Sequence, residues 1–188
     1  MSYEFQWSRR RMLAATLATA VAAPAILHTR PAPAAEMIGP QRWLELFNTH
    51  TGETVSVAYH DGRRVVADAV AKLERVLRDH RANEVHPIDP DLYDQLSAVA
   101  LEAGRDARFE VISGYRSPHS NAKLAAASSG VARRSLHMQG RAIDVRLKGA
   151  SCASVRDIAL AMARGGVGFY RKSNFVHLDT GRVRSWQG

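Results

Sequence analysis

The sequence predicts an α+β fold: a single small domain with a central antiparallel sheet flanked by helices. The chain has 188 residues, of which 46% are hydrophobic and 23% are charged, and this composition suits one globular domain with a core. Apolar residues alternate with polar ones in some segments and recur at helical spacing in others. The strand-like segments include pairs separated by short turns, which favours antiparallel pairing.

The first part of the domain predicts a hairpin followed by a long helix. Residues 42–47 and 54–59 alternate polar and apolar side chains, and residues 48–52 between them have the composition of a turn. Residues 65–81 then carry apolar side chains at helical spacing, at Val66, Val70, Leu73 and Leu77. We therefore expect two paired strands and one amphipathic helix.

The middle of the chain predicts two helices around a buried strand. Asp89 can cap a helix that has Pro90 at its first position and runs to about residue 103. Residues 108–112 have the composition of a buried strand, and residues 117–126 predict a short helix that begins at a Ser-Pro pair.

The last part predicts three strands and a further helix. Residues 142–147 predict a strand, and residues 154–164 predict a helix that the pair Gly165–Gly166 ends. Residues 167–170 and 175–178 predict two more short strands around a polar turn.

The first 35 residues predict an export signal rather than part of the domain. Arginines at positions 9–11 precede an apolar, alanine-rich run over residues 13–27, and small residues follow at 31–35. The arginine pair resembles the twin-arginine export signal. The run is shorter than the ~20 residues that a spanning helix needs, so we expect cleavage, with an uncleaved membrane anchor as the alternative. The predicted domain is residues 36–188.

Charge and cysteine content restrict the partners that we expect. The formal net charge is +8, and about +5 of it lies outside residues 1–35. This charge is compatible with an anionic polymer, but the basic residues are scattered without an aromatic-rich stripe, so nucleic acid is not an expected partner. The single cysteine, Cys152, excludes an intramolecular disulfide and is interpreted as a small buried or capping residue.

Three residues suggest a metal site. His137 and Asp144 lie seven positions apart, and His177 lies in a later predicted strand. Two histidines and a carboxylate are a ligand set for catalytic zinc, which keeps its fourth position open for water. Spacing alone leaves chance occurrence as the alternative. The chain lacks the His-Glu-x-x-His, Gly-x-Ser-x-Gly and Walker motifs, which excludes those hydrolase classes.

Three segments of the chain resemble the signatures of the D-alanyl-D-alanine zinc peptidases. They are Ser113-Gly-Tyr-Arg116-Ser, Ser135-x-His137-x-x-Gly140-x-Ala142-x-Asp144 and Val176-His177-x-Asp179. The segments at 77–81, 84–90 and 175–186 further resemble the murein endopeptidase K group, and the match covers residues 40–188. The resemblance implies a hedgehog/D-Ala-D-Ala peptidase-like fold. It also implies a zinc peptidase that cuts crosslinks between peptidoglycan stem peptides. With the export signal, we expect this peptidase in the periplasm or cell envelope, and we expect a monomer.

The same resemblance assigns roles to individual residues. It implies Zn²⁺ at His137, Asp144 and His177, and it places Arg116 beside the substrate, where a guanidinium stabilises an oxyanion or binds a carboxylate. A structural ion pair is the alternative for Arg116. Tyr170 is interpreted either as a residue that lines a cleft or as a core residue, and Trp186 as a core or rim residue.

The general base is the one departure from the family pattern. Many relatives carry a carboxylate three residues before the last histidine ligand, where this chain has Asn174. Asp179, two residues after His177, is the nearest candidate base, with an orienting role behind the ligand as the alternative. His119 is a weaker candidate. Asn174 also leaves open a second function, a catalytically silent, zinc-stabilised module that binds the cell wall.

Overall fold

The computed structural model describes residues 39–128 and 130–188, so the predicted export signal lies outside the described residues. The strands are β1 (Arg42–Asn48), β2 (Thr54–His60), β3 (Arg108–Ser113), β4 (Ala142–Leu147), β5 (Gly166–Tyr170), β6 (Phe175–Asp179) and β7 (Arg184–Gln187). The helices are α1 (Ala67–Val76), α2 (Pro90–Glu102), α3 (Pro118–Ala127), the short 3₁₀ helix η1 (Leu136–Gln139) and α4 (Cys152–Met162). Among the described residues, no helix is both long and apolar enough to cross a membrane.

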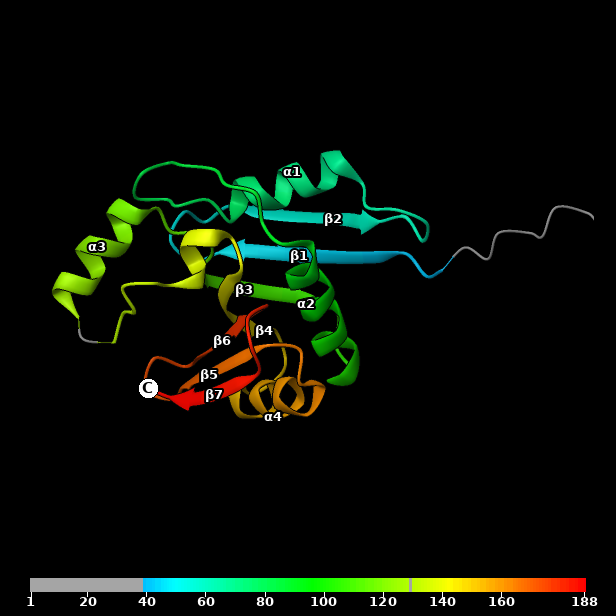
Figure 1. The fold of residues 1–188 in the computed structure, drawn as a ribbon. Coiled ribbons are helices and arrows are strands. Elements are labelled where there is room, and N and C mark those ends of the chain that lie inside the picture. Colours follow the sequence, from blue (N-terminus) through cyan, green and yellow to red (C-terminus); the bar gives the residue numbers. More distant parts are fainter. Residues whose placement is uncertain (1–38, 129) are drawn as a thin grey trace, which may run out of the picture. The chain divides into compact units, whose positions relative to one another are not determined.

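All the described strands form one seven-stranded sheet in the order β2-β1-β3-β4-β6-β5-β7 (Figure 1). The predicted α+β class is confirmed, and most neighbouring strands pair antiparallel as expected. The sheet is nevertheless mixed, because β1 pairs with β3 and β5 pairs with β7 in parallel. The prediction did not include β7, whose residues gain their strand conformation by pairing with β5 at the sheet edge.

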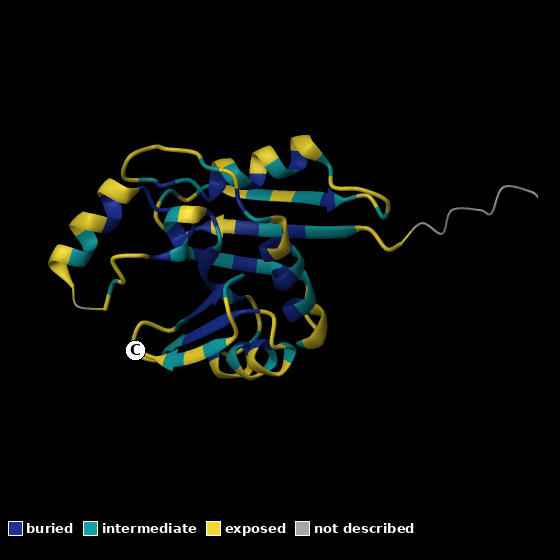
Figure 2. Cartoon of the chain, viewed as in Figure 1, coloured by how far each residue is buried: buried dark blue, intermediate teal, exposed yellow. Residues whose placement is uncertain are grey.

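Helices cover the sheet and bury its core. Contacts place α1 against β1 and β2, α2 against β1 and β4, and α4 against β4, β5 and β6. The buried residues of strands and helices form one hydrophobic cluster, and the outward faces of the helices are exposed (Figure 2). The third helix, α3, lies at one end of the sheet (Figure 1).

The helix α1 is shorter than predicted, and its last carbonyls show why. The sequence predicted a helix over residues 65–81, but α1 ends at Val76. The Val76 carbonyl accepts a hydrogen bond from the Asn48 side chain, and the Leu77 carbonyl accepts one from the Tyr115 amide at 2.7 Å. These tertiary partners replace the amides of a further helical turn. The segment after α1 is thereby joined to the loop that follows β3.

Strand alternation separates the core from the functional face of the sheet. In β4, Ile143 and Val145 belong to the hydrophobic cluster, as do Val176 and Leu178 in β6. Because successive side chains of a strand point to opposite faces, the residues between them project to the other face. Two of the predicted metal ligands occupy these intervening positions.

Candidate metal centre

Three elements bring the predicted metal ligands together. Asp144 and His177 are direct partners in the antiparallel register of β4 and β6, so their side chains share a face. His137 lies in η1, and Gly140 ends η1 with a φ of 65° before the chain enters β4. A Cβ at Gly140 would come within 2.1 Å of the Pro87 carbonyl oxygen. Only glycine therefore fits this turn, which returns the chain from His137 to the strand that carries Asp144.

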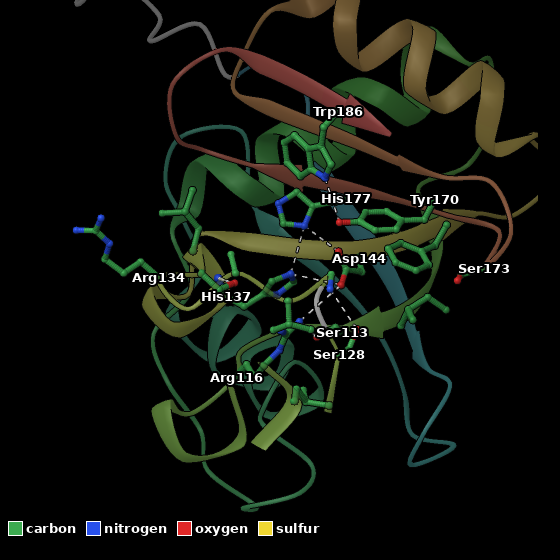
Figure 3. A pocket seen from close by; sticks show the side chains of 18 of the residues that line it. Ser113, Arg116, Ser128, Arg134, His137, Asp144, Tyr170, Ser173, His177 and Trp186 are labelled. Atoms are coloured by element: carbon green, nitrogen blue, oxygen red, sulfur yellow. Dashed lines mark hydrogen bonds and ion pairs between the residues drawn. The ribbon is translucent and has the colours of Figure 1, made fainter. Parts of the chain in front are cut away.

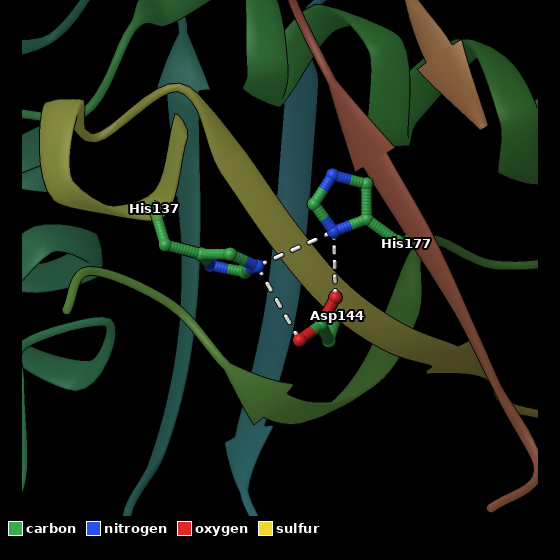
Figure 4. A group of neighbouring side chains, drawn as sticks. All are labelled: His137, Asp144 and His177. Atoms are coloured by element: carbon green, nitrogen blue, oxygen red, sulfur yellow. Dashed lines mark hydrogen bonds and ion pairs between the residues drawn. The ribbon is translucent and has the colours of Figure 1, made fainter. Parts of the chain in front are cut away.

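The ligand atoms converge with spacings that suit a tetrahedral ion (Figure 4). His137 Nε2 lies 3.3 Å from Asp144 Oδ2 and 3.3 Å from His177 Nδ1, and His177 Nδ1 lies 2.8 Å from Asp144 Oδ1. Zinc bonds of ~2.0–2.1 Å place the ligand atoms of a tetrahedral site about 3.3 Å apart. All three side chains are buried. The residues thus fit a zinc ion in number, donor type and spacing.

Each histidine is held from behind by a second partner. His137 Nδ1 lies 2.7 Å from the Gly114 carbonyl oxygen, and His177 Nε2 lies 3.1 Å from Asp179 Oδ2. Such partners fix the tautomer and ring orientation of a metal-ligating histidine. The inward nitrogens, Nε2 of His137 and Nδ1 of His177, are therefore the ones available to a metal.

Asp179 itself is fully buried behind His177. It accepts hydrogen bonds from the amides of Gly166 and Gly181, at 3.0 and 2.8 Å, and it forms an ion pair with Arg184 at 2.6 Å. Asp179 does not line the cavity described below. The Asp179 oxygens face His177 Nε2, the amides of Gly166 and Gly181, and the Arg184 guanidinium.

The electrostatics of the centre favour positive charge at its middle. Burial opposes ionisation of Asp144, but His137 and His177 outweigh it and hold the Asp144 pKa well below its usual range. Burial likewise raises the pKa of Asp179, yet hydrogen bonds from His177 and Arg184 hold it low. For His177, burial lowers the pKa, but Asp144 and Asp179 together raise it to about 9. Two buried carboxylates thus stabilise a cation at this point.

Arg116 approaches the same carboxylate from the loop after β3. Its Nη2 lies 3.9 Å from Asp144 Oδ2 and 3.3 Å from Ser113 Oγ, and its Nη1 lies 3.2 Å from Asn121 Oδ1. The neighbouring Ser117 is fixed by Asp79, which accepts hydrogen bonds from both the Ser117 amide and its hydroxyl. The guanidinium is therefore buried and oriented, and among the described residues the Asp144 carboxylate at 3.9 Å is its ion-pair partner.

The centre opens into a cavity of about 600 Å³ (Figure 3). Four arginines line it, Arg81, Arg116, Arg134 and Arg184. Among the described lining residues, Asp144 carries the only carboxylate. An aromatic wall of Tyr170, Phe175 and Trp186 stands beside His177. The cavity is thus cationic, with one apolar side.

The structure separates the residues that the sequence predicted into two groups. The three ligands, Arg116 and Asp179 come together, whereas Asn174 is an exposed turn residue with a φ of 53° and His119 is exposed on α3. Tyr170 lines the cavity, as one of its two interpretations held. The remaining cavity arginines and Asp79 were not predicted, because an isolated arginine or aspartate in a sequence has the pattern of an ordinary solvated residue.

Comparisons with known proteins show the family to which the chain belongs. The model of the family described as "Peptidoglycan L,D-endopeptidase MepK" matches residues 36–186. A relative of that name from Escherichia coli strain K12 is 43% identical over 97% of this chain and 99% of its own length. A "Probable peptidoglycan L,D-endopeptidase MepK" from Haemophilus influenzae is 40% identical over 78% of this chain and 80% of its own. No solved structure matches significantly. The chain therefore belongs to the peptidoglycan L,D-endopeptidase MepK family.

Proposed function

We propose that the chain is a zinc-dependent endopeptidase that hydrolyses an L,D peptide bond in crosslinks between peptidoglycan stem peptides. The observation that carries this proposal is the buried set of His137, Asp144 and His177 at the floor of a cationic cavity, in a member of this family. The names of the relatives supply the bond type. An L,D bond joins the carboxyl group of an L centre to the amino group of a D centre.

Zinc is the metal that the donor set supports best. Two imidazole nitrogens and one carboxylate are typical of catalytic zinc, and the three ligands leave an open position toward the cavity. When bound, zinc supplies Lewis acidity toward the scissile carbonyl group and toward a water molecule. The protein holds the ligands rigidly because two of them lie on paired strands and the third is fixed by the Gly114 carbonyl.

Arg116 stabilises the negative charge that develops on the substrate. Its guanidinium is fixed by Ser113 and Asn121 and lies beside Asp144 at the centre. A buried and preoriented cation costs little reorganisation when the carbonyl oxygen becomes negative. The alternative role, a structural ion pair, is less well supported, because its closest carboxylate contact is 3.9 Å long.

Asp179 orients His177 rather than accepting a proton from water. The Asp179 oxygens face His177 and accept hydrogen bonds from Gly166, Gly181 and Arg184. The Asp179 side chain is fully buried and does not line the cavity. A carboxylate with a strongly lowered pKa and no access to the cavity is poorly suited to be a general base.

The cavity and the N-terminus support a cell-wall substrate. Stem peptides carry free carboxylates, and the cavity arginines provide complementary charge. We propose that residues 1–35 direct export by the twin-arginine pathway to the periplasm, where such a substrate lies, and that the chain acts as a monomer. If residues 1–35 are not removed, we expect them to attach the chain to the membrane.

The test is an assay on crosslinked muropeptides of defined linkage. The zinc-loaded protein is incubated with L,D-linked and D,D-linked dimers, with and without a chelator, and the products are identified by mass spectrometry. We expect cleavage of the L,D-linked dimers alone, lost with chelator and restored by added zinc. Intact L,D-linked dimers in the zinc-loaded sample would contradict the proposal.

One observation favours a second candidate, the catalytically silent wall-binding module. Asn174 replaces the expected carboxylate, and among the described cavity residues no carboxylate besides Asp144 is present. This module would bind zinc and sediment with purified peptidoglycan sacculi while leaving every crosslink intact. The same muropeptide assay therefore separates the two candidates.

A further inference from the structure

Tyr170 and Trp186 form a hydrogen-bonded pair beside the metal centre. Tyr170 is the last residue of β5 and Trp186 lies in β7, and the indole Nε1 is 3.0 Å from the phenol oxygen. The indole ring also lies 5.1 Å from the His177 ring. A Cβ at Gly168 would come within 2.6 Å of the indole, so glycine in β5 provides the space in which Trp186 packs.

The direction of this hydrogen bond determines what the phenol can do. An indole nitrogen only donates, so the Tyr170 oxygen must be the acceptor from Trp186. The phenol proton is then available to another acceptor. Among residues 39–128 and 130–188, no side chain or carbonyl accepts it.

The phenol is placed where a substrate would be. Its ring stacks on Phe175, with centroids 4.5 Å apart, and both rings line the metal cavity. In Figure 3 the Tyr170 oxygen points toward the space beside His177 and Asp144, whereas Arg116 lies on the opposite side of these ligands. Tyr170 and Arg116 therefore face the same cavity from opposite sides, so both can approach one substrate oxygen that lies between them.

We propose that Tyr170 is a further catalytic residue, whose hydroxyl donates a hydrogen bond to the carbonyl oxygen of the scissile peptide. Trp186 is its positioning residue, because the indole fixes the phenol oxygen and leaves the proton directed into the cavity. The inference rests on the proposed peptidase function. The phenol keeps its proton throughout the reaction. The hydrogen bond from the phenol strengthens as negative charge develops on the carbonyl oxygen, and it thereby stabilises the transition state.

The direct test is Tyr170→Phe, which keeps the ring that stacks on Phe175 and removes only the hydroxyl. Loss of one oxyanion donor costs ~10²–10³ in kcat, so we expect kcat on an L,D-linked muropeptide dimer to fall about 100-fold. KM and zinc content should stay close to those of the unchanged protein. The matched control is Tyr93→Phe, which removes a hydroxyl that is buried in the core away from the cavity, and which should leave kcat unchanged.

Trp186→Phe tests the positioning role through a double-mutant cycle. The substitution keeps an aromatic ring but removes Nε1, and we expect a smaller loss of kcat, about 10-fold. Because Trp186 acts through Tyr170, adding Trp186→Phe to Tyr170→Phe should cause no further loss. A purely structural role of Trp186 predicts instead that the two losses multiply, which would overturn the positioning role.

A binding measurement gives a readout that does not depend on turnover. A phosphinate analogue of the scissile bond carries negative charge where the oxyanion forms, and its affinity is measured by calorimetry. We expect Tyr170→Phe to weaken the affinity for the phosphinate by about the same factor by which the substitution lowers kcat/KM. Unchanged kcat and unchanged phosphinate affinity in an otherwise active protein would overturn the Tyr170 role alone. No cleavage by the unchanged protein would instead reject the proposed function.

Discussion

His177 and Asp179 lie two residues apart on β6, and His177 Nε2 is 3.1 Å from Asp179 Oδ2. Since i and i+2 side chains share a strand face, the strand itself places the carboxylate beside the ligand. The opposite ring nitrogen, Nδ1, points to Asp144. A carboxylate on the far side of His177 from Asp144 can orient the imidazole ring, whereas a general base must reach the water molecule in the cavity. The two possible roles of Asp179 predict different effects of its substitution.

Replacing Asp179 by Asn should weaken zinc binding. The substitution removes the charge behind His177, and the loss of such a partner typically costs 10–100-fold in metal affinity or activity. Zinc affinity is measured by competition with a chromogenic chelator, and the melting temperature reports any general loss of stability. If the variant instead bound zinc like the unchanged protein and lost cleavage completely, Asp179 would be the general base.

Replacing Arg116 by Gln should reduce catalysis while zinc stays bound. The guanidinium does not contact the inward nitrogens of either histidine but lies beside Asp144, so its removal affects the transition state more than the metal. We expect kcat/KM to fall by ~10²–10³ with stoichiometric zinc retained. A variant that lost zinc together with activity would point to the structural ion-pair role.

Replacing Arg134 by Gln should affect substrate binding more than turnover. Arg134 lines the cavity, and in Figure 3 its guanidinium extends away from the metal ligands, where it can meet a distal part of the substrate. We expect a several-fold increase in KM, and a weaker salt dependence of kcat/KM, with kcat unchanged. The matched control is Arg133→Gln, which removes the same charge from a neighbouring exposed residue outside the cavity lining. Equal effects of both substitutions would indicate a general charge effect.

Asp79 should make the stability of the domain depend on acidic pH. Burial raises its pKa, but hydrogen bonds from Ser120, Ser117 and Arg81 outweigh this and lower the pKa from 3.8 to about 2. A carboxylate with a lower pKa in the folded state stabilises the fold above its unfolded pKa, and this stability is lost as the pH falls from about 4 toward 2. The contribution is on the order of 2 kcal/mol.

Urea unfolding of Asp79→Asn between pH 2 and 6 measures this contribution. We expect the variant to be less stable near pH 6 and to lose less stability than the unchanged protein over the acidic range. Asp106→Asn is the control, since Asp106 is an exposed residue before β3 that makes no hydrogen bond to Ser117. Identical acid dependence in the Asp79 variant and the unchanged protein would show that Asp79 is not the group that titrates.

Local patterns predicted much of the fold because they reflect burial on strands and helices. Alternation predicted β1 and β2, and a capping residue with a following proline predicted α2. The end of α1 and the strand β7 depend instead on partners far along the chain, the Tyr115 amide and β5. Such pairings leave no periodic signal in the segment itself.

The candidate site was predictable to a similar extent. The strands that carry Asp144 and His177 were predicted from the sequence, but the assignment of these residues as ligands, together with His137, depended on ordered motifs shared with a family. The cavity wall could not be predicted in the same way. Trp186 reaches Tyr170 only because β5 and β7 pair in parallel with Gly168 beside the indole. Charge alone likewise did not indicate that Arg81 and Arg134 line the same cavity.

The most direct test of the metal centre is the zinc content of His137→Ala after equilibrium dialysis, measured by atomic emission. Removing one of three ligands should abolish stoichiometric binding, because the two that remain cannot hold zinc at the concentrations used. His119→Ala removes an exposed histidine on α3 and should keep one zinc per chain, like the unchanged protein. Stoichiometric zinc in His137→Ala would show that the metal is held elsewhere and would contradict the assignment of His137, Asp144 and His177.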